Sequence, residues 1–183
     1  MTDFYLHKYT TNESISSGIV APHKYRHPLI KKMGKQQDCI NAWAKDKRKI
    51  IADYITKLKE IYSTNDAFML FTPPTMTRIF IDDIIDGIVN EFPNAIDLTK
   101  VFCKKENVSF GDAKYNDYTN EQLMEFIDID TEKLKSVDWN KIEKIFITDD
   151  VYASGKTIKL TKHIIKRILD KEFEIKSGVI LTI

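Results

Sequence analysis

Apolar residues recur along this chain with two different spacings, one typical of strands and one typical of helices. Short apolar runs at 67–72 and 144–148 indicate strands buried on both faces of a sheet, and 95–102 and 178–183 are further strand candidates. Apolar residues three and four positions apart predict helices over 75–91, 119–126 and 157–171. Strands that alternate with helices form βαβ units. The pattern therefore predicts an α/β fold with a doubly wound, mostly parallel sheet.

The first third of the chain has a different pattern. A short apolar segment at 4–9 predicts a strand, loops and prolines follow, and a long helix is expected over 35–62. The apolar stripe of that helix must be buried, so we expect the helix to pack over the α/β core. We expect residues 1–34 to form a hood above the carboxyl edge of the sheet. With 183 residues, the chain is expected to be one domain, in which the hood segment and long helix of 1–62 belong with an α/β core of 63–183.

The formal net charge of +1 hides an asymmetry along the chain. Residues 1–62 carry 12 Lys and Arg against 6 Asp and Glu, whereas residues 63–183 carry 16 against 21. The basic third could face an anion, such as a phosphorylated ligand, an acidic partner or nucleic acid. Nucleic acid has weaker support, because no Arg-rich or aromatic-interleaved run accompanies the charge. A solvated Lys-rich surface is the simpler interpretation.

Composition excludes several classes of protein. With 43% apolar and 30% charged residues, the chain is neither disordered nor collagen-like. No apolar run is long enough for a transmembrane helix, and the first residues lack the features of a secretory signal. Cys39 and Cys103 are the only cysteines, so we expect neither a disulfide framework nor a Cys-rich zinc site. These features favour a cytoplasmic protein with no membrane partner.

Residues 145–157 carry the most informative chemistry in the sequence. A buried strand delivers two adjacent carboxylates, Asp149 and Asp150, at its carboxyl end, where open parallel sheets bind ligands. The small residues of 153–157 then open a helix and direct backbone N–H groups at one point, which suits a phosphate. Carboxylates accept hydrogen bonds, so they suit vicinal hydroxyls and, indirectly, a hydrated Mg²⁺. Hydroxyls beside a phosphate describe a ribose 5-phosphate.

This stretch resembles the phosphoribosyl-pyrophosphate (PRPP) signature of type I phosphoribosyltransferases. The signature is an apolar strand, two acidic residues, a few mostly apolar residues, a small hydroxyl residue, Gly, any residue, and Thr or Ser. The resemblance implies the fold of that family, with Asp149 and Asp150 on the ribose hydroxyls. It also implies a 5-phosphate loop formed by Ala153, Ser154, Gly155, Lys156 and Thr157. Mg²⁺ is implied as the cofactor, held through PRPP and water rather than by direct protein ligands.

The implied reaction is transfer of the phosphoribosyl group from PRPP to a nitrogen nucleophile, with release of pyrophosphate. The segment after the first buried strand has the place of the family's pyrophosphate loop, so Thr75 is an expected ligand contact and Arg78 the candidate catalytic cation. A lysine near the end of the second strand has a similar part in the family, and Lys104 or Lys105 is placed for it. More weakly, the segment 25–35 and the Thr-Pro-Pro turn before Arg78 resemble the ComF-like branch.

Two departures from the family pattern leave a second function class open. Ala153 stands where the branch for 6-oxopurines has an aspartate. Residues 104–118, which we expect to be a mobile loop, lack the basic pattern of many catalytic loops in the family. The chain is therefore either an active phosphoribosyltransferase or a PRPP- or nucleotide-binding module that has become a regulator, a DNA-uptake accessory or a phage-defence component. A homodimer is compatible with either class, and the acceptor is not indicated.

Other motifs give weaker signals. Residues 155–157 end like a Walker A loop, but Asp150 stands where that motif requires Gly. The segment 82–86 spells the DDxxD pattern of prenyl-diphosphate synthases, but those enzymes are all-helical, so we interpret its three aspartates as a solvated helix face. His23 and His27 are flanked by prolines and are not expected to form a metal pair.

Overall fold

A five-stranded parallel sheet forms the centre of the protein. The structure is a computed structural model that describes residues 2–75, 78–106, 110, 115, 117–169 and 171–183. The strand order is β1-β7-β6-β2-β3, and every neighbouring pair is parallel. The strands are β1 (Phe4–Lys8), β2 (Phe68–Phe71), β3 (Ala95–Asp97), β6 (Lys144–Tyr152) and β7 (Glu174–Thr182). The predicted α/β fold with a parallel sheet is confirmed, and the arrangement is compatible with a doubly wound fold.

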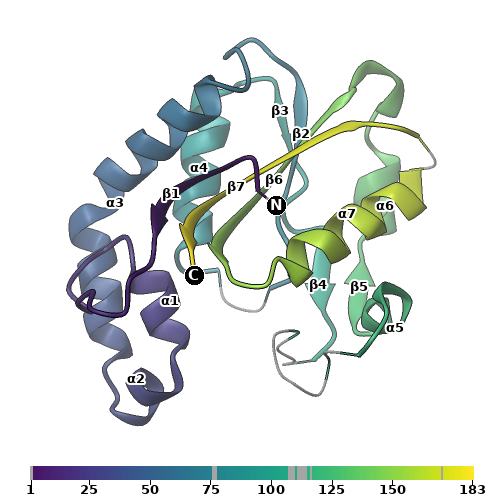
Figure 1. Cartoon of the computed structure of the whole chain (residues 1–183). Coiled ribbons are helices and arrows are strands. Elements are labelled where there is room, and N and C mark those ends of the chain that lie inside the picture. The colour runs from purple at the N-terminus through teal and green to yellow at the C-terminus, as the bar shows by residue number, and fades with distance from the viewer. Residues whose placement is uncertain (1, 76–77, 107–109, 111–114, 116, 170) are drawn as a thin grey trace.

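Helices cover both faces of this sheet (Figure 1). One face carries α1 (Ala21–Arg26), α3 (Gln36–Lys59) and α4 (Ile81–Glu91), with α2 (Pro28–Lys32) beside α1; the other carries α7 (Lys156–Leu169). Successive strand residues point to opposite faces, so each central strand supplies two cores. The α3 side receives Phe68, Leu70, Phe146 and Ile180, and the α7 side receives Met69, Phe71, Ile145, Ile147 and Val179. This double burial explains the uninterrupted apolar runs in the sequence.

The long helix α3 packs over the sheet, as its apolar stripe predicts. Trp43, Ile50, Tyr54 and Leu58 are buried along it. The helix ends at Lys59, three residues before the predicted end, but Tyr62 continues the buried face by stacking on Phe68 with ring centroids 4.8 Å apart. In the part of the chain that the structure describes, no helix has the length and apolarity to span a bilayer.

A small unit interrupts the main sheet between β3 and β6. It contains the antiparallel strands β4 (Phe102–Lys104) and β5 (Ile127–Ile129), the helices α5 (Asn120–Met124) and α6 (Thr131–Lys135), and a 3₁₀ turn at Trp139–Lys141. The prediction of one strand over 95–102 is wrong. Asp97 accepts hydrogen bonds from the backbone N–H (2.9 Å) and hydroxyl (2.7 Å) of Thr99, and the chain turns there. The predicted mobile loop over 104–118 falls mostly outside the described residues.

The N-terminal segment differs from the predicted hood. Residues 4–8 form β1, an edge strand of the sheet that pairs with β7, so the hood prediction is wrong for this part. The helix α1, in contrast, lies at the carboxyl edge, where it packs on α3 and contacts β6. The helix predicted from residue 75 begins only at Ile81.

Candidate functional site

The strand–turn–helix predicted for 145–157 is present at the carboxyl edge of the sheet. Strand β6 continues beyond Thr148, its predicted end, through both carboxylates to Tyr152. Ala153 and Ser154 are exposed in the turn, and α7 begins at Lys156. The turn and the first residues of α7 therefore lie directly after Asp149 and Asp150.

Gly155 gives this turn its shape. Its φ of 70° lies in the left-handed region, which residues with a side chain rarely adopt. A Cβ at this position would lie 2.3 Å from the hydroxyl oxygen of Tyr152. The Gly155 carbonyl accepts the first helical hydrogen bond, from the N–H of Lys159 at 2.9 Å. The N–H groups in the first turn of a helix have no acceptor within that helix, and here the N–H of Lys156 donates to the Ser154 hydroxyl oxygen at 3.4 Å.

The two adjacent aspartates have different surroundings. Asp150 has no exposed surface and is held by Arg26, which donates from Nη1 and Nη2 to the two carboxylate oxygens at 2.9 and 2.8 Å. Asp149 is half-buried, and its Oδ1 accepts a hydrogen bond from the backbone N–H of Asp150 at 2.9 Å. The site therefore presents one open carboxylate and one carboxylate that is already paired.

Electrostatics follow from this arrangement. Burial, together with the charge of Asp150, raises the pKa of Asp149 well above its ordinary value, and Arg26 offsets only part of the effect. The charge of Asp150 in turn raises the pKa of Arg26. Two carboxylates and one guanidinium thus share a small, poorly solvated volume. An incoming hydroxyl donor or cation would relieve the repulsion between the carboxylates.

A buried hydrogen bond fixes the strand immediately before the carboxylates. The hydroxyl oxygens of Tyr54 and Thr148 lie 2.6 Å apart, and both side chains are fully buried. Burial raises the pKa of the Tyr54 phenol, so the phenol stays neutral. This contact joins α3 to β6 one residue before Asp149.

Arg26 is the functional candidate that the sequence analysis missed. The positive charge of residues 1–62 and the resemblance of segment 25–35 both pointed to the part of the chain that contains Arg26, but neither identified this residue. Its partner is 124 positions away, and no local pattern connects two residues at that separation. Only the packing of α1 at the carboxyl edge brings them together.

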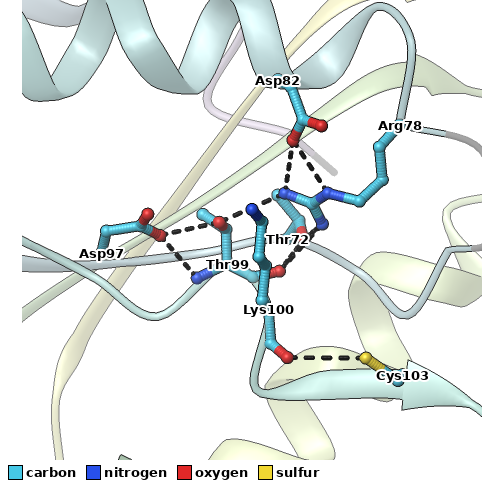
Figure 2. A network of polar contacts seen from close by, with 7 residues as sticks. All are labelled: Thr72, Arg78, Asp82, Asp97, Thr99, Lys100 and Cys103. Atoms are coloured by element: carbon cyan, nitrogen blue, oxygen red, sulfur yellow. Dashed lines mark hydrogen bonds and ion pairs between the residues drawn. The ribbon is translucent and has the colours of Figure 1, made fainter.

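Arg78 has other partners in the structure (Figure 2). Its guanidinium forms an ion pair with Asp82 at 2.8 Å and donates to the Thr99 carbonyl at 3.0 Å and to the Thr72 hydroxyl at 3.3 Å. Asp97 completes the network through Thr99. These bonds join the ends of β2 and β3 to the start of α4, so Arg78 stabilises the carboxyl edge beside the candidate site.

The remaining predicted residues lie in several places. Thr75 is half-buried after the buried prolines of the turn that follows β2. Lys104 ends β4, with its Nζ 4.6 Å from the ring centroid of Phe110, and Lys105 lies 3.9 Å from Asp128, so these contacts belong to the small unit. Lys156 donates from its side chain to the backbone carbonyl of Tyr115.

The DDxxD segment does not form a metal site among the described residues. Asp82 pairs with Arg78, whereas Asp83 accepts from the Trp43 indole N–H at 2.6 Å and from Lys47 at 2.9 Å. The interpretation as a solvated face therefore holds for the exposed Asp86 and for Asp82, whose side chain is 48% exposed, and only in part for the half-buried Asp83. Within the described ranges, no three His, Cys, Asp or Glu side chains come together as metal ligands.

Comparison of the sequence with models of known protein families and with curated proteins finds no match. The geometry at the carboxyl edge is therefore the basis for any functional assignment. It consists of a half-buried carboxylate, a paired carboxylate, a guanidinium and a left-handed turn that opens a helix. Together these groups suit a ligand that has both hydroxyls and phosphate.

Proposed function

We propose that this site binds ribose 5-phosphate compounds, and that the protein is a phosphoribosyltransferase with a fold of the type I kind. It would transfer the phosphoribosyl group of PRPP to a nitrogen nucleophile and release pyrophosphate. One observation carries the proposal. The end of β6 brings the Asp149 carboxylate next to a turn in which left-handed Gly155 opens α7.

The 5-phosphate is assigned to the turn. Residues 153–157 combine small side chains with the N–H groups of the first turn of α7, a helix of 14 residues. Such a helix start favours negative charge through its dipole and its N–H groups, of which that of Lys156 would exchange the long 3.4 Å contact with Ser154 for a phosphate oxygen. The exposed Ser154 hydroxyl adds a further donor.

The ribose hydroxyls are assigned to the carboxylate pair. Asp149 keeps one oxygen beyond the bond to the backbone N–H of Asp150, so it can accept from a hydroxyl group. Asp150 supports this carboxylate from below and is itself held in orientation by Arg26. In the reaction, the C1–O bond to pyrophosphate breaks and a C1–N bond forms, while the nitrogen loses its proton. The carboxylate of Asp149, which has no ion pair of the kind that Arg26 forms with Asp150, would stabilise the positive charge that develops on the ribose ring.

Mg²⁺ fits this site through the ligand rather than through a protein cage. The open oxygen of half-buried Asp149 suits a water-mediated contact with a hydrated cation. When bound, Mg²⁺ would neutralise charge on the leaving pyrophosphate. The protein's own contribution is to position the phosphate and the hydroxyls.

A binding module without catalysis is the second candidate, and a specific observation favours it. Two of the charged side chains predicted to act on the ligand already have strong protein partners: Asp150 with Arg26, and Arg78 with Asp82. A protein of this kind would bind PRPP or a nucleoside monophosphate and signal its presence. Release of pyrophosphate from PRPP in the presence of candidate nitrogenous bases separates the two functions.

Calorimetry with ribose 5-phosphate, inorganic phosphate and ribose tests the common binding site. We expect ribose 5-phosphate to bind more tightly than either fragment. Asp149→Asn should weaken it by about 10-fold or more, because a hydrogen bond to a charged group contributes about 1.5–3 kcal/mol. The matched control is Asp86→Asn, which makes the same change on an exposed residue of α4. Equal affinities for the Asp149 variant and the wild type would contradict the proposed site.

A further inference from the structure

The guanidinium of Arg26 does not use all of its N–H donors in the pair with Asp150. Two of its N–H groups hold Asp150, one each from Nη1 and Nη2. An arginine has five N–H donors, so three of them, including the one on Nε, are not used in the pair with Asp150. The Arg26 side chain is 35% exposed, whereas that of Asp150 is 1% exposed. A ligand that approaches from solvent therefore meets Arg26 and Asp149 first, with Asp150 covered beneath.

We propose that Arg26 binds the diphosphate of PRPP while it keeps its ion pair with Asp150. This inference rests on the proposed function and assigns the group that distinguishes PRPP from ribose 5-phosphate. Arg26 then has the part that the sequence analysis gave to Arg78. Its planar fork can contact phosphate oxygens and a carboxylate on different edges at the same time.

Charge balance at the site supports this assignment. A ligand with a diphosphate brings several negative charges to an edge that already has Asp149 and Asp150. Repulsion would oppose binding unless a cation lay beside them. Arg26 neutralises Asp150 and interacts with the charge of Asp149 as well. It is a permanently charged group at this point, because Asp150 raises its already high pKa.

Two other described cations near this edge, Arg78 and Lys156, already have protein partners. Arg78 is held by Asp82, Thr72 and Thr99. Lys156 donates to the carbonyl of Tyr115. Each would have to give up a contact to reach a diphosphate, whereas Arg26 would not.

The surroundings of Arg26 would also attract an anion. No acidic residue occurs between Glu13 and Asp38, a segment that contains all of α1 and α2. Lys24, two residues before Arg26, donates to the neutral hydroxyl of Tyr9 at 2.7 Å and so keeps its positive charge uncompensated by that partner. The positive field of α1 therefore surrounds the proposed diphosphate position.

The experiment compares two ligands across matched variants. Calorimetry in the presence of Mg²⁺ gives the dissociation constants of PRPP and ribose 5-phosphate, and their ratio isolates the diphosphate. Arg26→Gln alone would leave Asp150 buried and unpaired, so the main variant is the neutral pair Arg26→Gln with Asp150→Asn. Asp150→Asn alone keeps the guanidinium, and Arg48→Gln removes an exposed arginine of α3. Thermal unfolding of each variant verifies that it is folded.

We expect the wild type, Asp150→Asn and Arg48→Gln to prefer PRPP over ribose 5-phosphate by about 10- to 100-fold. The pair variant should lose that preference and still bind ribose 5-phosphate. The inference about Arg26 would be overturned, without the proposed function, by any of three results. The pair variant could keep the preference for PRPP, it could bind both ligands equally more weakly, or Arg78→Gln could lose the preference instead. Absence of ribose 5-phosphate binding to the wild type would overturn the proposed function and, with it, this assignment.

Discussion

Truncation of Arg26 is the sharpest test of how the carboxyl edge is held together. Arg26→Ala removes two charge-assisted hydrogen bonds, of 2.9 and 2.8 Å, and leaves the fully buried Asp150 without its cation. A buried pair that loses one partner costs about 3–5 kcal/mol. Arg26 is 35% exposed, so water can reach part of the vacated space. We therefore expect a loss of about 2–4 kcal/mol in the free energy of unfolding.

The reverse truncation should be milder. Asp150→Asn leaves the guanidinium, which solvent can reach, and keeps an amide oxygen as acceptor for it. Urea unfolding followed by circular dichroism measures both changes. With a slope of about 2 kcal/mol per M, Arg26→Ala should lower the midpoint by about 1–2 M, and Asp150→Asn by less.

The double variant completes a thermodynamic cycle. Arg26→Ala with Asp150→Asn should be clearly more stable than the sum of the two single losses, with a coupling energy of about 1–3 kcal/mol. The control is the exposed pair between Lys57 of α3 and Glu60, the residue after that helix, for which we expect no more than about 0.5 kcal/mol. Additivity within about 0.5 kcal/mol at Arg26 and Asp150 would refute the reasoning, because the two groups would then not share a desolvated ion pair.

Three further predictions follow from the same region. Tyr54→Phe leaves the buried Thr148 hydroxyl unpaired and should lower the free energy of unfolding by about 1–2 kcal/mol in urea titrations. Gly155→Ala forces a side chain into the left-handed region and against Tyr152, so it should cost about 1–3 kcal/mol and weaken ribose 5-phosphate binding in calorimetry. Because the folded state raises the pKa of Asp149, the stability that this group contributes is lost as the pH rises from about 4 through that raised value. Asp149→Asn should therefore raise the melting temperature at neutral pH, and its advantage should shrink as the pH falls toward about 4.

Each of these predictions has its own contradictory outcome. An unchanged urea midpoint in Tyr54→Phe would mean that the hydroxyl pair contributes nothing to stability. A Gly155→Ala variant with wild-type stability would show that the turn accepts another backbone conformation, and adding Tyr152→Ala should recover part of the loss if the clash is real. A melting temperature for Asp149→Asn that is below that of the wild type at every pH would contradict the proposed repulsion.

The sequence predicted the elements whose pattern repeats over many residues. The stripe of α3 and the apolar runs of β2 and β6 are governed by burial, which acts on every turn or on both faces. The short elements β5 and α6 were missed, because three and five residues are too few to display a period. Helix α6 depends instead on a local cap, in which the Asp130 side chain accepts from the N–H of Lys133.

Some residues of the candidate site could likewise be predicted from the sequence, and others could not. Asp149 and Gly155 lie within one contiguous stretch, so strand, turn and helix start could be inferred together. The pairing of Asp150 with Arg26 depends on how α1 packs against the edge, and the engagement of Arg78 depends on a turn at Thr99 that the sequence analysis assigned to a strand. Tertiary packing therefore decided which charged side chains are open to a ligand.

The position of β1 also constrains how the protein acquires its structure. This strand is formed near the start of the chain but pairs only with β7, the last strand, and Arg26 closes onto a residue 124 positions later. Closing loops of this length is entropically costly and slows folding. On a ribosome, α1 can pack on α3 early, but β1 has no partner strand and Arg26 has no carboxylate partner until β7 and β6 have been synthesised. The turn at residues 153–157 depends on local contacts, whereas the charged edge around Asp150 needs two segments that are far apart in the sequence.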